Sequence, residues 1–86
     1  MNIRMRFFAS LREITGQSEA SWVLPEGTTI SEVRTLIVER FPRLQFILAR
    51  CVYAVNRGYV AADTALHEGD ELVFIPPMAG GARWEL

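Results

Sequence analysis

The 86-residue chain contains no lysine, since all nine of its basic residues are arginines. Base composition or habitat explains this absence better than function does, although it also removes every side-chain amine that could accept an isopeptide bond. The single cysteine, Cys51, excludes an intrachain disulfide, a cysteine-based zinc cage and a four-thiolate iron–sulfur site. We therefore expect neither a metal nor a cofactor.

Charge and hydropathy exclude two further classes of protein. The net charge of −1 provides no basic surplus of the kind that binds nucleic acid. No apolar run is long enough to cross a bilayer, and arginines interrupt the first apolar run, where a signal peptide would be uninterrupted. These features predict a cytoplasmic protein, and the length allows one domain.

Hydrophobic periodicity predicts an α+β domain, in which a single mixed sheet of four or five strands packs on one main helix. Strands are expected over 2–9, 17–24, 51–55, 59–60 and 71–75, a short helical turn over 10–15, and helices over 30–40 and 44–49. Thr29 and Glu32 fit a capping box at the start of the main helix. Its apolar positions predict one buried stripe, made of Ile30, Val33, Leu36, Ile37 and Phe41.

A sheet covered on one side leaves its other face in water. Strand alternation places Arg4, Arg6 and Phe8 on that open face. In the last strand, Val73 and Ile75 share it if Glu71 points to solvent. Together with Tyr59 these residues would form an apolar patch rimmed by arginines. Two interpretations are open on this pattern alone: a partner site, or ordinary scattered hydrophobes.

The segment 76–81, Pro-Pro-Met-Ala-Gly-Gly, follows the last predicted strand. The two prolines stiffen its start, and consecutive glycines can thread a narrow channel because they have no side chains. Taken alone, the Gly80-Gly81 pair favours a frayed tail.

Other parts of the chain change that interpretation. The segments 7–13, 53–56 and 69–71 read Phe-Phe-Ala-Ser-Leu-Arg-Glu, Tyr-Ala-Val-Asn and Gly-Asp-Glu. With the Pro-Pro-x-x-Gly-Gly end, this pattern resembles the small subunit of molybdopterin synthase (the MoaD family of ubiquitin-like sulfur carriers). The resemblance covers residues 2–81. It implies a ubiquitin-like β-grasp domain over 1–81 that ends in a flexible Gly-Gly tail.

The resemblance also implies a function. In that family an ATP-dependent enzyme of the ubiquitin-activating type adenylates the terminal glycine carboxylate, and a sulfur donor converts it to a thiocarboxylate. The tail enters the large synthase subunit, where the sulfur attacks cyclic pyranopterin monophosphate. Gly81 would carry the sulfur and Gly80 would supply clearance, while catalysis belongs to the large subunit. The residues expected to contact the partner are Phe8, Arg12, Tyr59, Ile75, Pro76 and Pro77.

One feature departs from the family pattern: residues 82–86, Ala-Arg-Trp-Glu-Leu, follow Gly81. A Gly81 held in a peptide bond has no carboxylate to adenylate. Proteolytic removal, a fusion with the large subunit, an expression artefact and drift to another role are four open explanations. The alternative functions are a ubiquitin-like protein modifier, a carrier for thiamine or cysteine synthesis, and an inert interaction domain.

Several other residues invite a functional interpretation. We expect Cys51 to be a small buried hydrophobe and His67 a solvated loop residue. Trp22 is expected in the core or at a sheet edge. Four acidic residues lie close in sequence and predict a solvated edge that faces a basic partner rather than a metal site: Asp63, Glu68, Asp70 and Glu71.

Overall fold

A computed structural model describes residues 1–76 of the chain. The predicted carrier residues Gly80 and Gly81, the proline Pro77 and the extension 82–86 lie outside the described residues. The strands are β1 (Asn2–Phe7), β2 (Glu19–Val23), β3 (Val52–Val55), β4 (Gly58–Val60) and β5 (Glu71–Ile75). The helices are α1 (Ala9–Thr15), α2 (Ile30–Arg40), the 3₁₀ turn η1 (Pro42–Leu44) and α3 (Gln45–Leu48).

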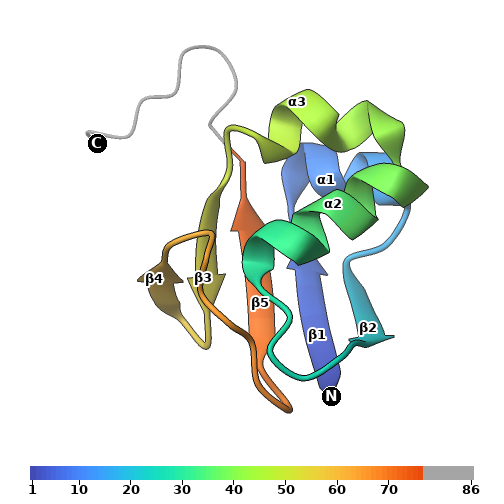
Figure 1. The fold of residues 1–86 in the computed structure, drawn as a ribbon. Helices are drawn as coiled ribbons and strands as arrows, with labels where there is room; N and C mark the ends of the chain where they lie inside the picture. Colours follow the sequence, from blue (N-terminus) through green and yellow to red (C-terminus); the bar gives the residue numbers. More distant parts are fainter. Residues whose placement is uncertain (77–86) are drawn as a thin grey trace.

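The five strands form one mixed sheet in the order β2-β1-β5-β3-β4. The two central strands, β1 and β5, run parallel, and every other neighbouring pair is antiparallel. The helices lie on one side of this sheet, and the other side is open (Figure 1). The α+β prediction of a four- to five-stranded sheet on a main helix is therefore confirmed.

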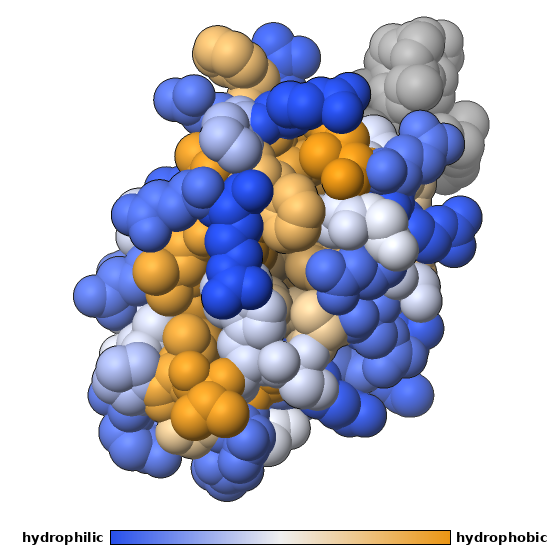
Figure 2. All heavy atoms as spheres, turned by 90° about the vertical axis from the view of Figure 1, so that its right-hand side faces the viewer, coloured by the Kyte–Doolittle hydropathy of each residue, from blue (hydrophilic) through white to orange (hydrophobic). Residues whose placement is uncertain are grey.

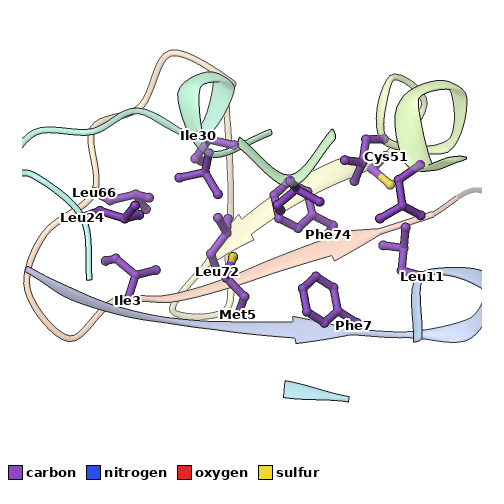
Figure 3. Packing of buried hydrophobic residues seen from close by; sticks show 14 residues of the cluster. Ile3, Met5, Phe7, Leu11, Leu24, Ile30, Cys51, Leu66, Leu72 and Phe74 are labelled. Carbon is purple, nitrogen blue, oxygen red and sulfur yellow. The ribbon is translucent and has the colours of Figure 1, made fainter. Parts of the chain in front are cut away.

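The core lies between the sheet and the helices. Alternation in β1 sends Ile3, Met5 and Phe7 inward, where each is buried. Their β5 counterparts, Leu72 and Phe74, are fully buried beside them, and the side chains from both strands point into the same layer (Figure 3). Burial of a large apolar side chain contributes about 1.5–3 kcal/mol, so this layer dominates the stability of the domain.

The main helix, α2, begins with the predicted capping box. The Thr29 hydroxyl accepts from the Glu32 amide at 3.3 Å, and the Glu32 carboxylate accepts from the Thr29 amide at 2.8 Å. Two otherwise unpaired groups at the helix start are thereby satisfied. The predicted buried stripe is right for Ile30, Val33 and Ile37 but wrong for Leu36, which is exposed beside β2.

The boundaries of several elements differ from those predicted. The second strand covers Glu19–Val23 rather than 17–24, and the Gln17 amide at its predicted start bonds the Thr15 hydroxyl at the end of α1. The predicted helix over 44–49 divides into η1, which starts at Pro42, and α3. Within residues 1–76, no helix has the length and apolarity needed to cross a membrane.

The predicted solvated acidic edge is wrong for Asp70, which is buried. Its carboxylate accepts hydrogen bonds from the Asn56 side-chain amide at 2.9 Å and from the His67 backbone amide at 2.8 Å. Asp70 therefore joins the β3–β4 turn to the loop before β5. His67 itself is exposed, as predicted.

Two other acidic residues of that group, Glu68 and Glu71, also make contacts within the fold, whereas Asp63 is exposed, as predicted. Glu68 accepts from the backbone and side chain of Asn2, and these bonds lower the pKa of its carboxyl. Glu71 lies 3.6 Å from Arg4 and 3.9 Å from Arg6 on the open face. In the described part of the chain, no group of three metal-ligating side chains occurs.

The capping box provides a test of the fold. Replacing Thr29 by alanine should lower the free energy of unfolding by about 1 kcal/mol, because the Glu32 amide loses its acceptor. Thr35→Ala is the matched control, since Thr35 lies within the same helix and is exposed. Urea unfolding of both variants measures the difference. Equal stabilities for the two would contradict the proposed role of the cap.

Candidate functional site

Apolar side chains gather on the open face of the sheet around β5. Val73 and Ile75 lie there, and Ile75 is paired with Val52 across the β3–β5 ladder. Directly opposed residues share a face, so Val52 is exposed on the same side. We define the open-face patch as Phe8, Val52, Tyr59, Val73 and Ile75.

Phe8 belongs to this patch because of its position at the end of β1. Its backbone is still extended, with φ −120° and ψ 156°, before α1 begins. Phe7 is paired with Phe74 in the parallel ladder, so the next residues, Phe8 and Ile75, lie level on the opposite face. Phe8 remains 42% exposed, and the Arg6 guanidinium lies 5.7 Å from its ring centre.

Arginines border the patch on the β1 side. Arg4 and Arg6 project from β1 and share the carboxylate of Glu71. Arg12 lies one helical turn after Phe8, with its backbone amide 3.4 Å from the Phe8 carbonyl, and is exposed. This arrangement gives an apolar surface with a cationic rim, which is suited to a partner that carries carboxylates around an apolar contact.

The structure brings together most of the residues predicted from sequence, but not all of them equally. Phe8 and Ile75 lie side by side, and Pro76 follows directly where β5 ends. Tyr59 is 78% exposed but lies on the edge strand β4, two strands away from β5. The patch therefore extends from the end of β5 to the sheet edge.

Val52 is a patch residue that the sequence interpretation missed. It belongs to an apolar run, and nothing in the run says which of its residues point outward. The one available signal was alternation with the neighbouring residue, Tyr53. Its ring packs edge-on to the ring of Phe74 in the core, with 5.6 Å between the two ring centres. That contact depends on the register between β3 and β5, which is a tertiary property.

Cys51 lies in the core, as predicted, rather than in a reactive site. Its thiol donates to the Ile47 carbonyl at 3.3 Å. Burial raises the pKa of the thiol from 9.0 to about 11, because a thiolate would lose its hydration there. A thiol with so little thiolate is a poor nucleophile, so Cys51 is unsuited to relaying sulfur.

Comparison of the sequence with known protein families identifies the family of this chain. The ThiS family matches residues 5–81, a range that ends at Gly81. The chain belongs to the ThiS family. The molybdopterin synthase sulfur carrier subunit of Chlamydomonas reinhardtii is 35% identical over 83 residues, which cover 94% of this chain and 100% of the relative. The subunit of the same name from Escherichia coli K12 is 33% identical over 81 residues, covering 92% and 99% of the two chains.

Solved structures share the fold of this ThiS-family chain. Small archaeal modifier protein 1 of Haloferax volcanii superposes with a TM-score of 0.79 at 21% identity, over 90% of this chain and 98% of its own. A chain from the complex of subunits 1 and 2 of the Helicobacter pylori molybdopterin-converting factor superposes with a TM-score of 0.67 at 24% identity, over 94% of this chain and 100% of its own. The fold is thus the predicted ubiquitin-like β-grasp.

The burial of Cys51 leads to a chemical test. At pH 8 the thiol should be alkylated by iodoacetamide about a hundredfold more slowly in the folded chain than in urea, because the raised pKa cuts the thiolate fraction by that factor and burial blocks access further. Mass spectrometry of timed samples gives both rates. Similar rates in the two states would show that Cys51 is accessible and would reopen its role.

Proposed function

We propose that this chain is the sulfur-carrying small subunit of a cytoplasmic molybdopterin synthase. The observation that carries the proposal is the family match that runs through to Gly81, together with relatives that are named as sulfur carrier subunits of that synthase. Among the described residues the single thiol, Cys51, is buried, so the proposal places the sulfur on the chain end and not on a cysteine.

The chemistry assigned to the tail requires a free carboxylate on Gly81. That carboxylate attacks the α-phosphorus of ATP, so that an acyl adenylate forms and pyrophosphate leaves. A sulfide equivalent then attacks the acyl carbon, AMP leaves, and a thiocarboxylate remains. The thiocarboxylate sulfur is a soft nucleophile, and in the large subunit it attacks a carbon of cyclic pyranopterin monophosphate and displaces an oxygen substituent. Water then cleaves the acyl–sulfur bond, so that the sulfur stays on the pterin and Gly81 is a carboxylate again. Positioning by the partner supplies the catalysis.

Residues 82–86 must be removed before this chemistry can start. We infer that the chain is processed after Gly81, because the family match ends at that residue. The glycine pair 80–81 then becomes the C-terminus of a carrier domain formed by residues 1–81. Without side chains, these glycines fit a channel too narrow for other residues.

The open-face patch is the surface we assign to the large subunit. It lies where β5 ends, so a partner seated on it also surrounds the start of the tail. Phe8, Val52 and Tyr59 offer exposed apolar area, and the arginines beside them offer charge. The adenylating enzyme must bind the same tail, and we expect it to contact the same surface.

The state of the chain end is the direct test of the function. Intact-mass analysis of protein purified from its own host should find a chain that ends at Gly81, a fraction of which has one oxygen replaced by sulfur. In a reconstituted reaction, the chain ending at Gly81 as a thiocarboxylate should yield molybdopterin with the large subunit. The matched control ends at Ala79 and should yield none.

Three results would contradict the proposal. A mature protein that always retains Trp84 cannot present the required carboxylate. Conjugates between Gly81 and lysines of other proteins, found without any thiocarboxylate, would instead identify a protein modifier. Transfer of sulfur to a thiazole or cysteine precursor, rather than to the pterin, would identify a different carrier of the same fold.

The patch can be tested separately from the chemistry. Val52→Asp should weaken binding to the large subunit at least about tenfold, because a carboxylate is then buried in an apolar contact. Val23→Asp is the matched control, since Val23 is exposed on the same sheet face but lies on β2 at the far edge. Calorimetric titration measures both affinities. Equal weakening by the two variants would place the contact elsewhere.

A further inference from the structure

The strand β2 forms one edge of the sheet and is bonded on one side only. Met1 and Leu24 exchange two backbone hydrogen bonds, of 2.6 and 2.8 Å. Such bonded pairs alternate along an antiparallel ladder, so residues Ala20 and Trp22 also direct their backbone groups toward β1. The N–H and C=O groups of Glu19, Ser21 and Val23 consequently point away from the sheet, at its free edge.

Natural sheets usually protect such an edge with charges or proline. Here Glu19, at the start of the strand, is the one charged residue of β2, Ala20 to Val23 are uncharged, and the first proline, Pro25, comes after the strand. Val23 is 79% exposed. The edge is therefore a free template for another extended chain.

A groove of about 660 Å³ lies beside this edge, between β2 and α2. Trp22 and Leu24 line it from the strand side, and Leu36 lines it from the helix. Figure 2 faces the side of the molecule where β2 and α2 lie and shows apolar atoms exposed between hydrophilic groups. This groove accounts for the exposure of Leu36, which the helical pattern had assigned to the core.

The helix wall of the groove also carries charge. The Arg40 guanidinium lies 4.8 Å from the centre of the Trp22 ring, and within residues 1–76 it forms no ion pair. Glu39 precedes it in the same wall. A single carboxylate on the occupant would pair with Arg40, whereas a run of carboxylates would be repelled by Glu39.

We propose that this edge and groove bind an extended segment of another protein, which adds a strand beside β2. Its backbone pairs with the free groups of Glu19, Ser21 and Val23. Its alternate side chains are apolar and enter the groove, since every second residue of a strand faces the same side. One carboxylate near its end reaches Arg40.

The position of Arg40 sets the direction of the segment. Leu36 lies toward the Pro25 end of β2, because both residues also line a second, smaller hollow. Arg40 is one turn further along α2, toward the start of β2. In the antiparallel arrangement, which is the more stable per residue, the carboxylate must therefore lie near the C-terminal end of the bound segment.

This site is independent of the open-face patch, which lies on the other side of β1 and includes no residue of β2 or α2. The sulfur-transfer proposal is unaffected by whether the groove binds a peptide. An occupant here would recruit the carrier to another protein without covering the end of β5.

The test is a nuclear magnetic resonance titration of the full ¹⁵N-labelled chain with the peptide acetyl-Ser-Val-Ser-Val-Ser-Asp-amide, whose valines and aspartate share the face that enters the groove. Saturable shifts are expected at the amides of Glu19, Ser21 and Val23. A peptide with lysine in place of the aspartate should bind about tenfold more weakly. Arg40→Glu should reverse that preference, while the exposed Arg43→Glu, which makes the same charge change outside the groove, should leave it unchanged.

A third peptide, with proline in place of the central serine, loses a backbone donor and should not bind. Absence of saturable shifts at β2, or equal binding of the aspartate and lysine peptides, would overturn the proposal. So would concentration-dependent shifts of β2 in the protein alone, together with a dimer in sedimentation, because the occupant would then be a second copy of the chain.

Discussion

The parallel pairing of β1 with β5 is the contact on which the rest of the molecule depends. It joins the first and last strands, which lie more than sixty residues apart in the chain, and sets Met5 beside Leu72 and Phe7 beside Phe74. All four side chains are buried under the helices. Forming this pair closes almost the whole chain into one loop, and the apolar layer beneath it offsets the entropy of that closure.

The same pairing fixes what appears on the opposite face. Since side chains alternate, burying Phe7 and Phe74 leaves Phe8 and Ile75 adjacent in solvent, directly beside the end of β5. The surface that we assign to a partner is thus the outer side of the β1–β5 pair. A rigid platform at the start of the tail would let the partner hold the carrier domain while the glycines reach inward.

Several polar side chains of this protein stabilise the fold and take no part in chemistry. Asp70 and Glu68, which looked like free acidic residues, secure the loop before β5 to Asn56 and Asn2. Cys51 is a core residue with a raised thiol pKa. The chemistry proposed for this ThiS-family chain therefore falls on its glycine end, and the two sheet surfaces, the open-face patch and the β2 edge, serve contact rather than catalysis.

Much of this protein was determined by local sequence. The capping box at Thr29 and the alternation in β1 each follow from interactions within a few residues, and both were predicted correctly. The Gly80-Gly81 end and the family resemblance were likewise found without the structure, because each motif consists of consecutive residues.

Only the tertiary structure decided which strand lies next to which, and with what register. That pairing exposed Val52, buried Asp70, moved Leu36 from the expected core to a groove beside β2, and placed the strand β3 between Tyr59 and the end of β5. Periodicity gives a strand two faces but does not say which face meets a neighbour, since that choice is made by contacts between residues far apart in the chain.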